Sequence, residues 1–282
     1  MHKQQKAGYH AITDGEFRRA TWHLDFMWGF NGVGHAPTQT GLPFHGEAAM
    51  VDDTYLTGKV SLDTHPFVEH FKFVKALEDE NSVAKLTIPA PAQFIEQMIM
   101  PFAQENTRKY YADNRELAED IAAGYKKFIA DVYAAGCRNL QFDDCSWGML
   151  VDPLACTYFG TDDKGLEAIK EQLLELNNLA IAGKPDDLVI NTHVCRGNFH
   201  STYASSGAYD GVAQTLLARE NVGAYYLEFD DARSGGFAPL AAVSGDKKVV
   251  LGLVTTKRAQ LEDKDAVIAR IHEAEKYLPL DR

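Results

Sequence analysis

The stretch LVINTHVCRGN, residues 188–198, runs from an apolar strand directly into a His-x-Cys pair. Successive side chains of an extended strand alternate between its two faces, so Asn191, His193 and Cys195 are expected on one face. An imidazole and a thiolate then lie side by side, and these are ligand types that zinc prefers. An isolated pair of this kind is common by chance, because cysteine is among the residue types most often buried. A metal site therefore requires further ligands elsewhere in the chain.

A second apolar stretch, AYYLEFDD at residues 224–231, supplies a candidate third ligand. In an extended strand Tyr226, Glu228 and Asp230 share one face, and Glu228 is the expected ligand. Both this glutamate and the His-x-Cys pair fall at or just past the ends of successive strands, where parallel α/β folds place their chemistry. The sequence therefore predicts a zinc centre at this edge of a sheet.

Short apolar segments alternate with helical segments along the chain. Strands are expected at residues 9–13, 55–60, 85–90, 139–145 and 249–255, and in the two stretches above. Helices are expected at about 66–80, 114–136, 164–182, 211–219 and 264–277. Asn114 is the expected N-cap of the most regular helix, and Gly136 is expected to end it.

This alternation indicates a parallel sheet, and polar residues at the strand ends favour a TIM-type (β/α)8 barrel in one domain, residues 1–282. No GxGxxG motif follows any strand, which argues against a dinucleotide-binding fold. Only seven strands are counted, and the chain begins almost at a strand, so the missing one should be the first. The aromatic and Gly/Pro-rich stretch at about 22–46 has no steady period and is expected to be a long loop.

The overall charge restricts the classes of partner. Forty acidic against 28 basic residues give a formal charge of −12, which argues against nucleic acid or an anionic membrane as a main partner. The N-terminus has no signal-peptide core and no apolar stretch approaches ~18 residues, so a cytoplasmic protein is expected. Four cysteines without paired spacing are expected to be free thiols, one of them on the metal: Cys137, Cys145, Cys156 and Cys195.

Several segments, in this order, resemble the catalytic barrel of the cobalamin-independent methionine synthase family, particularly its shorter single-domain relatives. They are ITDGEFRR (12–19), KLTIPAP (85–91), LQFDD (140–144), HVCRGN (193–198), YYLEFDD (225–231), VVLGLVTTK (249–257) and LPLDR (278–282). The resemblance implies a (β/α)8 fold and transfer of a methyl group, from a 5-methyltetrahydrofolate-like donor, to the thiol of homocysteine. It also implies zinc held by His193, Cys195 and Glu228.

The resemblance implies that Glu16 and Asp143 bind the amino group of homocysteine. Two carboxylates suit an ammonium group, although acids at strand ends also cap helices or form salt bridges. Where methionine synthase has a proton-donating histidine, this chain has Lys257, which is expected to face the active-site mouth and to serve the donor or the product. A free thiol is mostly protonated at neutral pH, and zinc would deprotonate it.

The chain also departs from the family pattern. It ends at Arg282, where relatives continue to a second cysteine ligand, and it lacks their first strand and serine-bearing substrate loop, so a fragment is expected. The folate-binding N-terminal domain of methionine synthase is missing as well, which leaves the donor open. Two alternatives follow: a zinc enzyme that acts on another thiol or donor, such as an epoxide, and an inactive truncated barrel with unpaired edges. The sequence leaves the oligomeric state open.

Overall fold

The computed structural model describes residues 1–282 and divides into two compact units. The first unit comprises Met1–Thr38, Val51–Asp143 and Leu176–Asn191. The second unit comprises Gln39–Met50, Asp144–Glu175 and Thr192–Arg282. Neither unit is continuous in sequence, and the expectation of a single domain stays a prediction.

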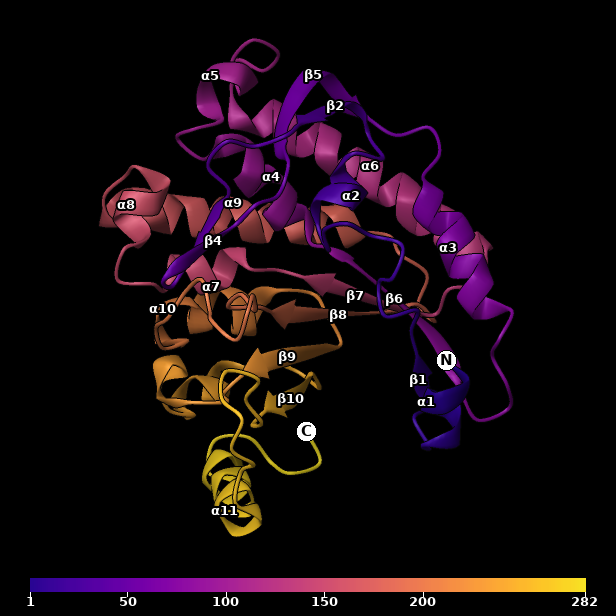
Figure 1. Ribbon diagram of the computed structural model, residues 1–282, viewed down its shortest axis with the longest axis vertical. Coiled ribbons are helices and arrows are strands. Elements are labelled where there is room, and N and C mark those ends of the chain that lie inside the picture. The colour runs from indigo at the N-terminus through magenta and orange to yellow at the C-terminus, as the bar shows by residue number, and fades with distance from the viewer. The chain divides into compact units, whose positions relative to one another are not determined.

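The main sheet has six strands in the order β1-β6-β7-β8-β9-β10 (Figure 1). Their bounds are β1 Ala11–Ile12, β6 Val83–Pro89, β7 Asn139–Asp143, β8 Val189–Val194, β9 Ala224–Glu228 and β10 Lys248–Gly252. The pairs β1–β6, β6–β7, β8–β9 and β9–β10 are parallel. The predicted α/β class with a parallel sheet is confirmed. Since the strand order ends at β1 and β10, this sheet is an incomplete barrel.

The strand count differs from the prediction in one element. Residues 55–60 do form a strand, β5 (Asp53–Ser61), but it pairs antiparallel with β2 (Asn31–Ala36) in a separate ribbon. The predicted long loop at 22–46 was therefore wrong: it contains α2 (Leu24–Met27), β2, and the hairpin of β3 (Leu42–Phe44) and β4 (Glu47–Ala49). These short elements carry too many glycines and aromatics for a regular apolar period.

The first unit packs helices against β6, β7 and the ribbon. The longest is α6 (Asn114–Ala134), which buries Leu117, Ile121, Tyr125 and Phe128 along one face and lies against β5 (Figure 1). Its N-cap is Asp113, whose carboxylate accepts the N–H of Glu116, and not Asn114 as predicted. The helix places its capping acid one residue earlier than the apolar period indicated.

Proline both ends and begins elements in this unit. Strand β6 ends at Pro89 as predicted, and Pro91 then begins α4 (Pro91–Ile99), a helix that the sequence pattern did not indicate. Proline suits the first helical position because its missing N–H would have no helical partner there. The other helices of this unit are α1 (His2–Lys6), α3 (Pro66–Lys75) and α5 (Gln104–Thr107).

The second unit carries β9, β10 and the end of β8, with mostly short helices around them (Figure 1). These are α7 (Ser146–Leu150), α8 (Ala155–Phe159), α10 (Asp210–Val212), the π-helix η1 (Ala213–Leu217), the 3-10 helices η2 (Ala232–Ser234) and η3 (Ala238–Ala242), and α11 (Lys264–Glu275). The helix α9 (Asp163–Ile181) begins in this unit and ends in the first. The predicted helix at 211–219 is thus a short α-turn followed by a π-helix.

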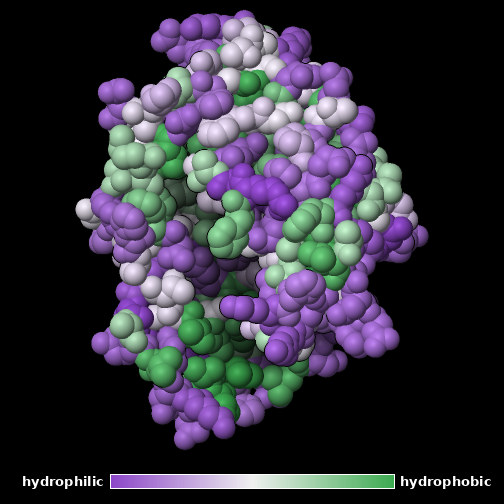
Figure 2. All heavy atoms as spheres, turned by 45° about the vertical axis from the view of Figure 1, so that its right-hand side comes forward, coloured by the Kyte–Doolittle hydropathy of each residue, from purple (hydrophilic) through white to green (hydrophobic).

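The surface near the end of the second unit is partly apolar. Figure 2 shows hydrophobic residues gathered over the lower part of the molecule, the region of β10 and α11 in Figure 1. Val250 of β10 and Ile268 of α11 are exposed, as are Val254 and Leu280. No helix of the chain, α11 included, combines the length and the apolar character needed to cross a membrane.

Candidate metal centre

Strands β8 and β9 bring the three predicted metal ligands together within the second unit. Their parallel pairing sets His193 opposite Tyr226, so Cys195, just past the end of β8, is level with Glu228 at the end of β9. One ligand atom from each of His193, Cys195 and Glu228 lies within 4.8 Å of the other two. All three residues are partly exposed, which leaves the cluster accessible.

The ring of His193 is oriented by the backbone of β9. Its Nδ1 lies 3.0 Å from the carbonyl oxygen of Tyr226 and, since a carbonyl only accepts, carries the proton. The second ring nitrogen, Nε2, therefore has the lone pair that a metal ion requires. Histidine ligands of protein metal sites are commonly oriented by such a hydrogen bond.

Cys195 is surrounded by groups that favour its thiolate. A hydrogen bond from the Cys145 thiol lowers the pKa of Cys195 well below the usual range, against the effect of burial, and His193 acts in the same direction only when both of its ring nitrogens are protonated. The backbone N–H of Gly197 also donates to the sulfur at 3.3 Å. Since the thiolate is the form that binds metals, Cys195 is prepared as a ligand.

Helix α7 places Cys145 beside the ligand strand. The backbone N–H of Asp144 donates to the carbonyl of His193 at 2.8 Å. One turn later, a Cβ on Gly148 would lie 2.6 Å from the carbonyl oxygen of Cys195, too close for any side chain. Glycine at this position therefore allows the helix to approach the end of β8 directly.

Glu228 is held at both carboxylate oxygens. Its Oε1 accepts the backbone N–H of Arg196 at 3.1 Å, and its Oε2 accepts Nη2 of Arg233 at 2.9 Å. Burial raises its pKa, and the nearby Cys195 thiolate adds to this, whereas Arg233 and the Arg196 N–H oppose it. Its own backbone N–H donates to the hydroxyl of Tyr209 at 3.0 Å. The carboxylate is therefore fixed in orientation.

The side chain of Arg196, next to the cysteine ligand, is fully buried. Its three guanidinium nitrogens have no hydrogen-bond partner in the chain, and the group stacks over the ring of Tyr209 at 4.3 Å. Stacking on an aromatic ring offsets part of the cost of burying a charge. The permanently charged residue is thus stabilised mainly by that ring.

The donor set of the cluster fits zinc. A nitrogen, a sulfur and a carboxylate oxygen are its usual ligands, and catalytic zinc sites combine three protein ligands with one open position. Asp230, which shares the face of Glu228 in the sequence pattern, instead pairs with Arg233 at 2.9 Å. The cluster therefore consists of the three predicted residues, without Asp230 as a second carboxylate.

Lys257 lies beside the loop that follows the ligands. Its Nζ donates to Oδ1 of Asn198 at 2.9 Å, and the hydroxyl of Thr256 donates to the same oxygen at 3.3 Å. Asn198 ends the HVCRGN segment that contains two of the ligands. The lysine is therefore attached to the loop that follows β8, and its role in the chemistry stays a prediction.

The two predicted ammonium-binding carboxylates belong to the first unit, where both lie near Arg19. Glu16, in a left-handed backbone conformation with φ 60°, accepts Arg19 Nη1 at 2.7 Å and the Thr87 hydroxyl at 2.5 Å. Gln141 donates to Asp143 at 2.6 Å. Burial lowers the pKa of Arg19, while Glu16 and Asp143 are among the charges that raise it. A resident cation thus already compensates part of this negative charge.

Sequence reasoning did not find three groups that support these sites: Arg19, Cys145 and Arg233. Arg19 and Arg233 each follow their carboxylates within a few residues, in DGEFRR and LEFDDAR, so a spacing signal existed. Cys145 had no such signal, because only the packing of α7 on β8 brings it to Cys195.

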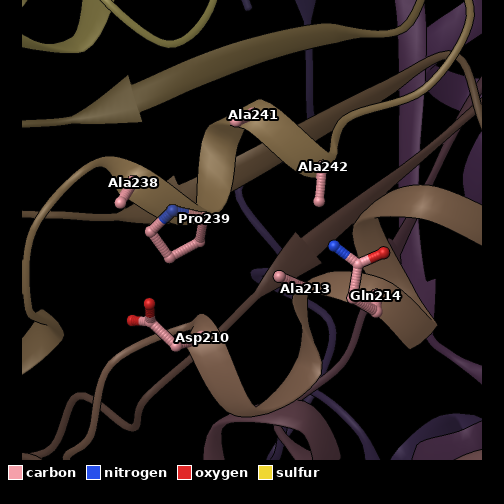
Figure 3. Close-up of a pocket in the computed structure, with 7 residues that line it drawn as sticks. All are labelled: Asp210, Ala213, Gln214, Ala238, Pro239, Ala241 and Ala242. Carbon is pink, nitrogen blue, oxygen red and sulfur yellow. The ribbon is translucent and has the colours of Figure 1, made fainter.

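A separate pocket of about 260 Å³ lies in the second unit, between α10–η1 and η3 (Figure 3). It is lined by Asp210, Ala213, Gln214, Ala238, Pro239, Ala241 and Ala242. Its lining contains none of the predicted site residues.

Comparison with known proteins identifies the family. No family model matches the chain, but the Bacillus subtilis (strain 168) proteins YxjH and YxjG, both uncharacterised, are 39% and 36% identical over 286 and 283 residues. These matches span 100% of this chain and 73% of each relative. A methionine synthase from Saccharolobus solfataricus is 23% identical over 284 residues, covering 98% of this chain and 71% of that protein.

Comparison with solved structures leads to the same family. A Listeria monocytogenes protein, solved as a candidate vitamin-B12-independent methionine synthase, superposes with a TM-score of 0.73 at 34% identity, covering 99% of this chain and 74% of that one. A B12-independent methionine synthase from a Shewanella species has the same fold, with a TM-score of 0.71 at 20% identity over 99% of this chain and 75% of that one. The predicted barrel-type fold is thereby confirmed, and the chain belongs to the cobalamin-independent methionine synthase-like family.

Proposed function

We propose that this protein is a zinc-dependent S-methyltransferase that transfers a methyl group from a 5-methyltetrahydrofolate-like donor to the thiol of homocysteine. The observation that carries the proposal is the convergence of His193, Cys195 and Glu228 within 4.8 Å. Membership of the family supports the methyl-transfer chemistry. The specific thiol and donor are part of the proposal.

Zinc bound by these three residues would lower the pKa of a substrate thiol and so favour its nucleophilic thiolate at neutral pH. The chain's own groups prepare the centre for that role. The Tyr226 carbonyl fixes the tautomer of His193, and the Cys145 thiol stabilises the thiolate of Cys195. The substrate sulfur would then attack the methyl carbon, forming the S–C bond as the donor N–C bond breaks. The donor nitrogen would keep the electron pair of that bond and take up one proton, equivalent to the proton lost by the thiol, and leave as a neutral amine.

Substrate binding is assigned to residues outside the metal cluster. Glu16 and Asp143 of the first unit would bind the ammonium group of homocysteine, since carboxylates form charge-assisted hydrogen bonds with it. Lys257, bonded to Asn198 beside the ligand loop, would serve the donor or the product. Replacement of Lys257 by Met should alter turnover or the KM of one substrate, and unchanged values for both would remove it from the mechanism.

The test is methionine formation by the zinc-loaded protein, measured against a panel of thiols and methyl donors. Homocysteine with a reduced-folate donor should give the highest kcat/KM, and Cys195→Ala should abolish turnover. Cys156→Ala is the matched control, because Cys156 lies on α8 and its thiol contacts Asp163. A wild-type protein that binds zinc but methylates none of the thiols would end the proposal.

A second candidate function keeps the zinc-thiolate chemistry and changes the electrophile. It is favoured by Lys257, a cation at the position where the methionine synthase pattern has a proton-donating histidine. An epoxide in the donor panel separates the two functions: consumption of the epoxide by a thiol, without methyl transfer, would support the alternative.

A further inference from the structure

Arg233 is the most extensively paired cation of the second unit. Its Nη2 lies 2.9 Å from Glu228 Oε2 and 2.9 Å from an oxygen of Asp230, and its Nη1 lies 2.5 Å from Asp231. Only 6% of its side chain is exposed. One guanidinium thus joins a predicted metal ligand to two further carboxylates.

The position of Arg233 does not depend on its contact with Glu228. The Asp231 carboxylate caps η2 by accepting the backbone N–H of Arg233 at 2.9 Å. The carbonyl of Arg233 accepts the N–H of Gly207 at 2.8 Å, and its guanidinium lies 5.1 Å from the ring centre of Tyr203. The arginine is therefore held from several sides before Glu228 is considered.

Two opposite roles are compatible with the contact between Arg233 and Glu228. The arginine could compete with a metal ion for the carboxylate, or it could orient the carboxylate for the ion. An ionised carboxylate has about four lone-pair positions on two oxygens, and Arg233 and the Arg196 N–H use one on each oxygen. Lone pairs for a metal ion therefore remain while both hydrogen bonds are kept.

We propose that Arg233 is a positioning residue, which orients the carboxylate of Glu228 for metal binding through a charge-assisted hydrogen bond. The planar guanidinium reaches Glu228 and Asp230 with one nitrogen and Asp231 with another. The point charge of a lysine does not reproduce this fork. The inference rests on the proposed metal centre and adds to it a residue that no ligand pattern contains.

The test is the affinity of the metal-free protein for zinc(II) and cobalt(II), measured in competition with a chelator. Arg233→Lys keeps the positive charge and removes the fork, so it reports orientation without a change of net charge. Loss of a group that orients a ligand typically weakens metal binding about ten- to a hundred-fold, and this loss is expected here. The absorption bands of the cobalt(II) form should shift as well, because the coordination of Glu228 changes.

Arg219→Lys is the matched control. Arg219 also pairs with a glutamate, Glu171, at 2.7 Å, but on the surface of the same unit, so neither metal affinity nor the cobalt spectrum should change. Asp231→Asn gives a second route if Arg233→Lys folds poorly. It loosens Arg233 on the side away from Glu228 and should weaken metal binding in the same direction, by a smaller factor.

The outcomes separate the inference from the proposed function. Wild-type protein that binds neither metal would overturn the metal centre and the inference together. Metal binding by the wild type with unchanged or tighter binding by Arg233→Lys and Asp231→Asn would overturn the inference alone, and tighter binding would identify Arg233 as a competitor. Weaker binding by both variants, with Arg219→Lys unchanged, supports the positioning role.

Discussion

The metal cluster of the second unit and the carboxylate pair of the first unit differ in how their charges are balanced. In the first unit, Arg19 is paired with Glu16 at 2.7 Å and is sensitive to the charge of Asp143. In the second unit, Cys195 and His193 contribute a sulfur and a nitrogen donor, and Arg233 contacts one oxygen of Glu228, Oε2. The first arrangement suits the binding of a small cationic group among existing charges, and the second suits a divalent ion. The two sets of residues should therefore respond differently to mutation.

The largest expected effect is loss of metal from the second unit. Cys195→Ala and His193→Ala should each reduce zinc from about one ion per chain to background, because two remaining ligands are too few for a stable site. Elemental analysis after dialysis measures this, with Glu16→Gln as the control that should retain its zinc. Equal zinc in all three variants would break the distinction between the two regions.

The next largest effect concerns acid stability of the first unit. His65 caps α3 and is buried, and desolvation lowers its pKa to about 4, although its hydrogen bond to Phe26 opposes this. The pKa of His65 in the unfolded chain is about 6.5, so the unfolded chain takes up a proton at a higher pH than the folded one. The free energy of unfolding therefore keeps its full value above pH 6.5 and falls by about 3 kcal/mol in total as the pH drops toward 4.

Unfolding by urea between pH 7 and pH 4 measures this loss. The variant His65→Asn keeps a capping acceptor and cannot titrate, so its unfolding free energy should fall less over the same range. Parallel curves for the wild type and the variant would show that His65 is not the acid-sensitive group. The result would distinguish the two units, because the acid-sensitive stability belongs to the first unit and involves no metal.

A smaller effect is expected from the carboxylates that are assigned to the substrate. Glu16→Gln or Asp143→Asn should weaken homocysteine binding about ten- to a hundred-fold, since a charge-assisted hydrogen bond contributes roughly 1.5–3 kcal/mol. Calorimetric titration of the zinc-loaded variants gives the affinity, and their zinc content should equal that of the wild type. Unchanged affinity in both variants would mean that these acids only balance the charge of Arg19 and do not bind the substrate.

The smallest effect concerns the thiol pair of the second unit. Cys145 is the main cause of the low pKa of Cys195, so Cys145→Ala should raise that pKa and slow alkylation of Cys195 at pH 7 by several-fold in metal-free protein. Mass spectrometry of iodoacetamide-treated protein measures the rate. Cys156→Ala should leave it unchanged, and an equal rate in Cys145→Ala would contradict the hydrogen bond.

The convergence of His193, Cys195 and Glu228 could be predicted from the sequence, because strand alternation is a local rule. The side chains of His193, on β8, and of Cys195, just past its end, converge for that reason, and the order of elements indicated a parallel sheet. The partners Cys145 and Arg233 could not be predicted, since their contacts depend on how α7 and η2 pack. The strand β5 was predicted, but its pairing with β2 was not, because the pattern of a strand does not show which distant segment it pairs with.

The buried guanidinium of Arg196 has a consequence for local opening of the second unit. This permanent charge contacts only the aromatic ring of Tyr209, so it gains solvation when water reaches it. The segment that covers Arg196 should therefore open at a lower free-energy cost than a segment over an apolar core. The N–H groups of Ala204 and Ser205 both donate to the Arg196 carbonyl and should exchange with deuterium sooner than those of β8. The loop that borders the metal ligands is thus expected to open and close on its own, without unfolding of the sheet that carries it.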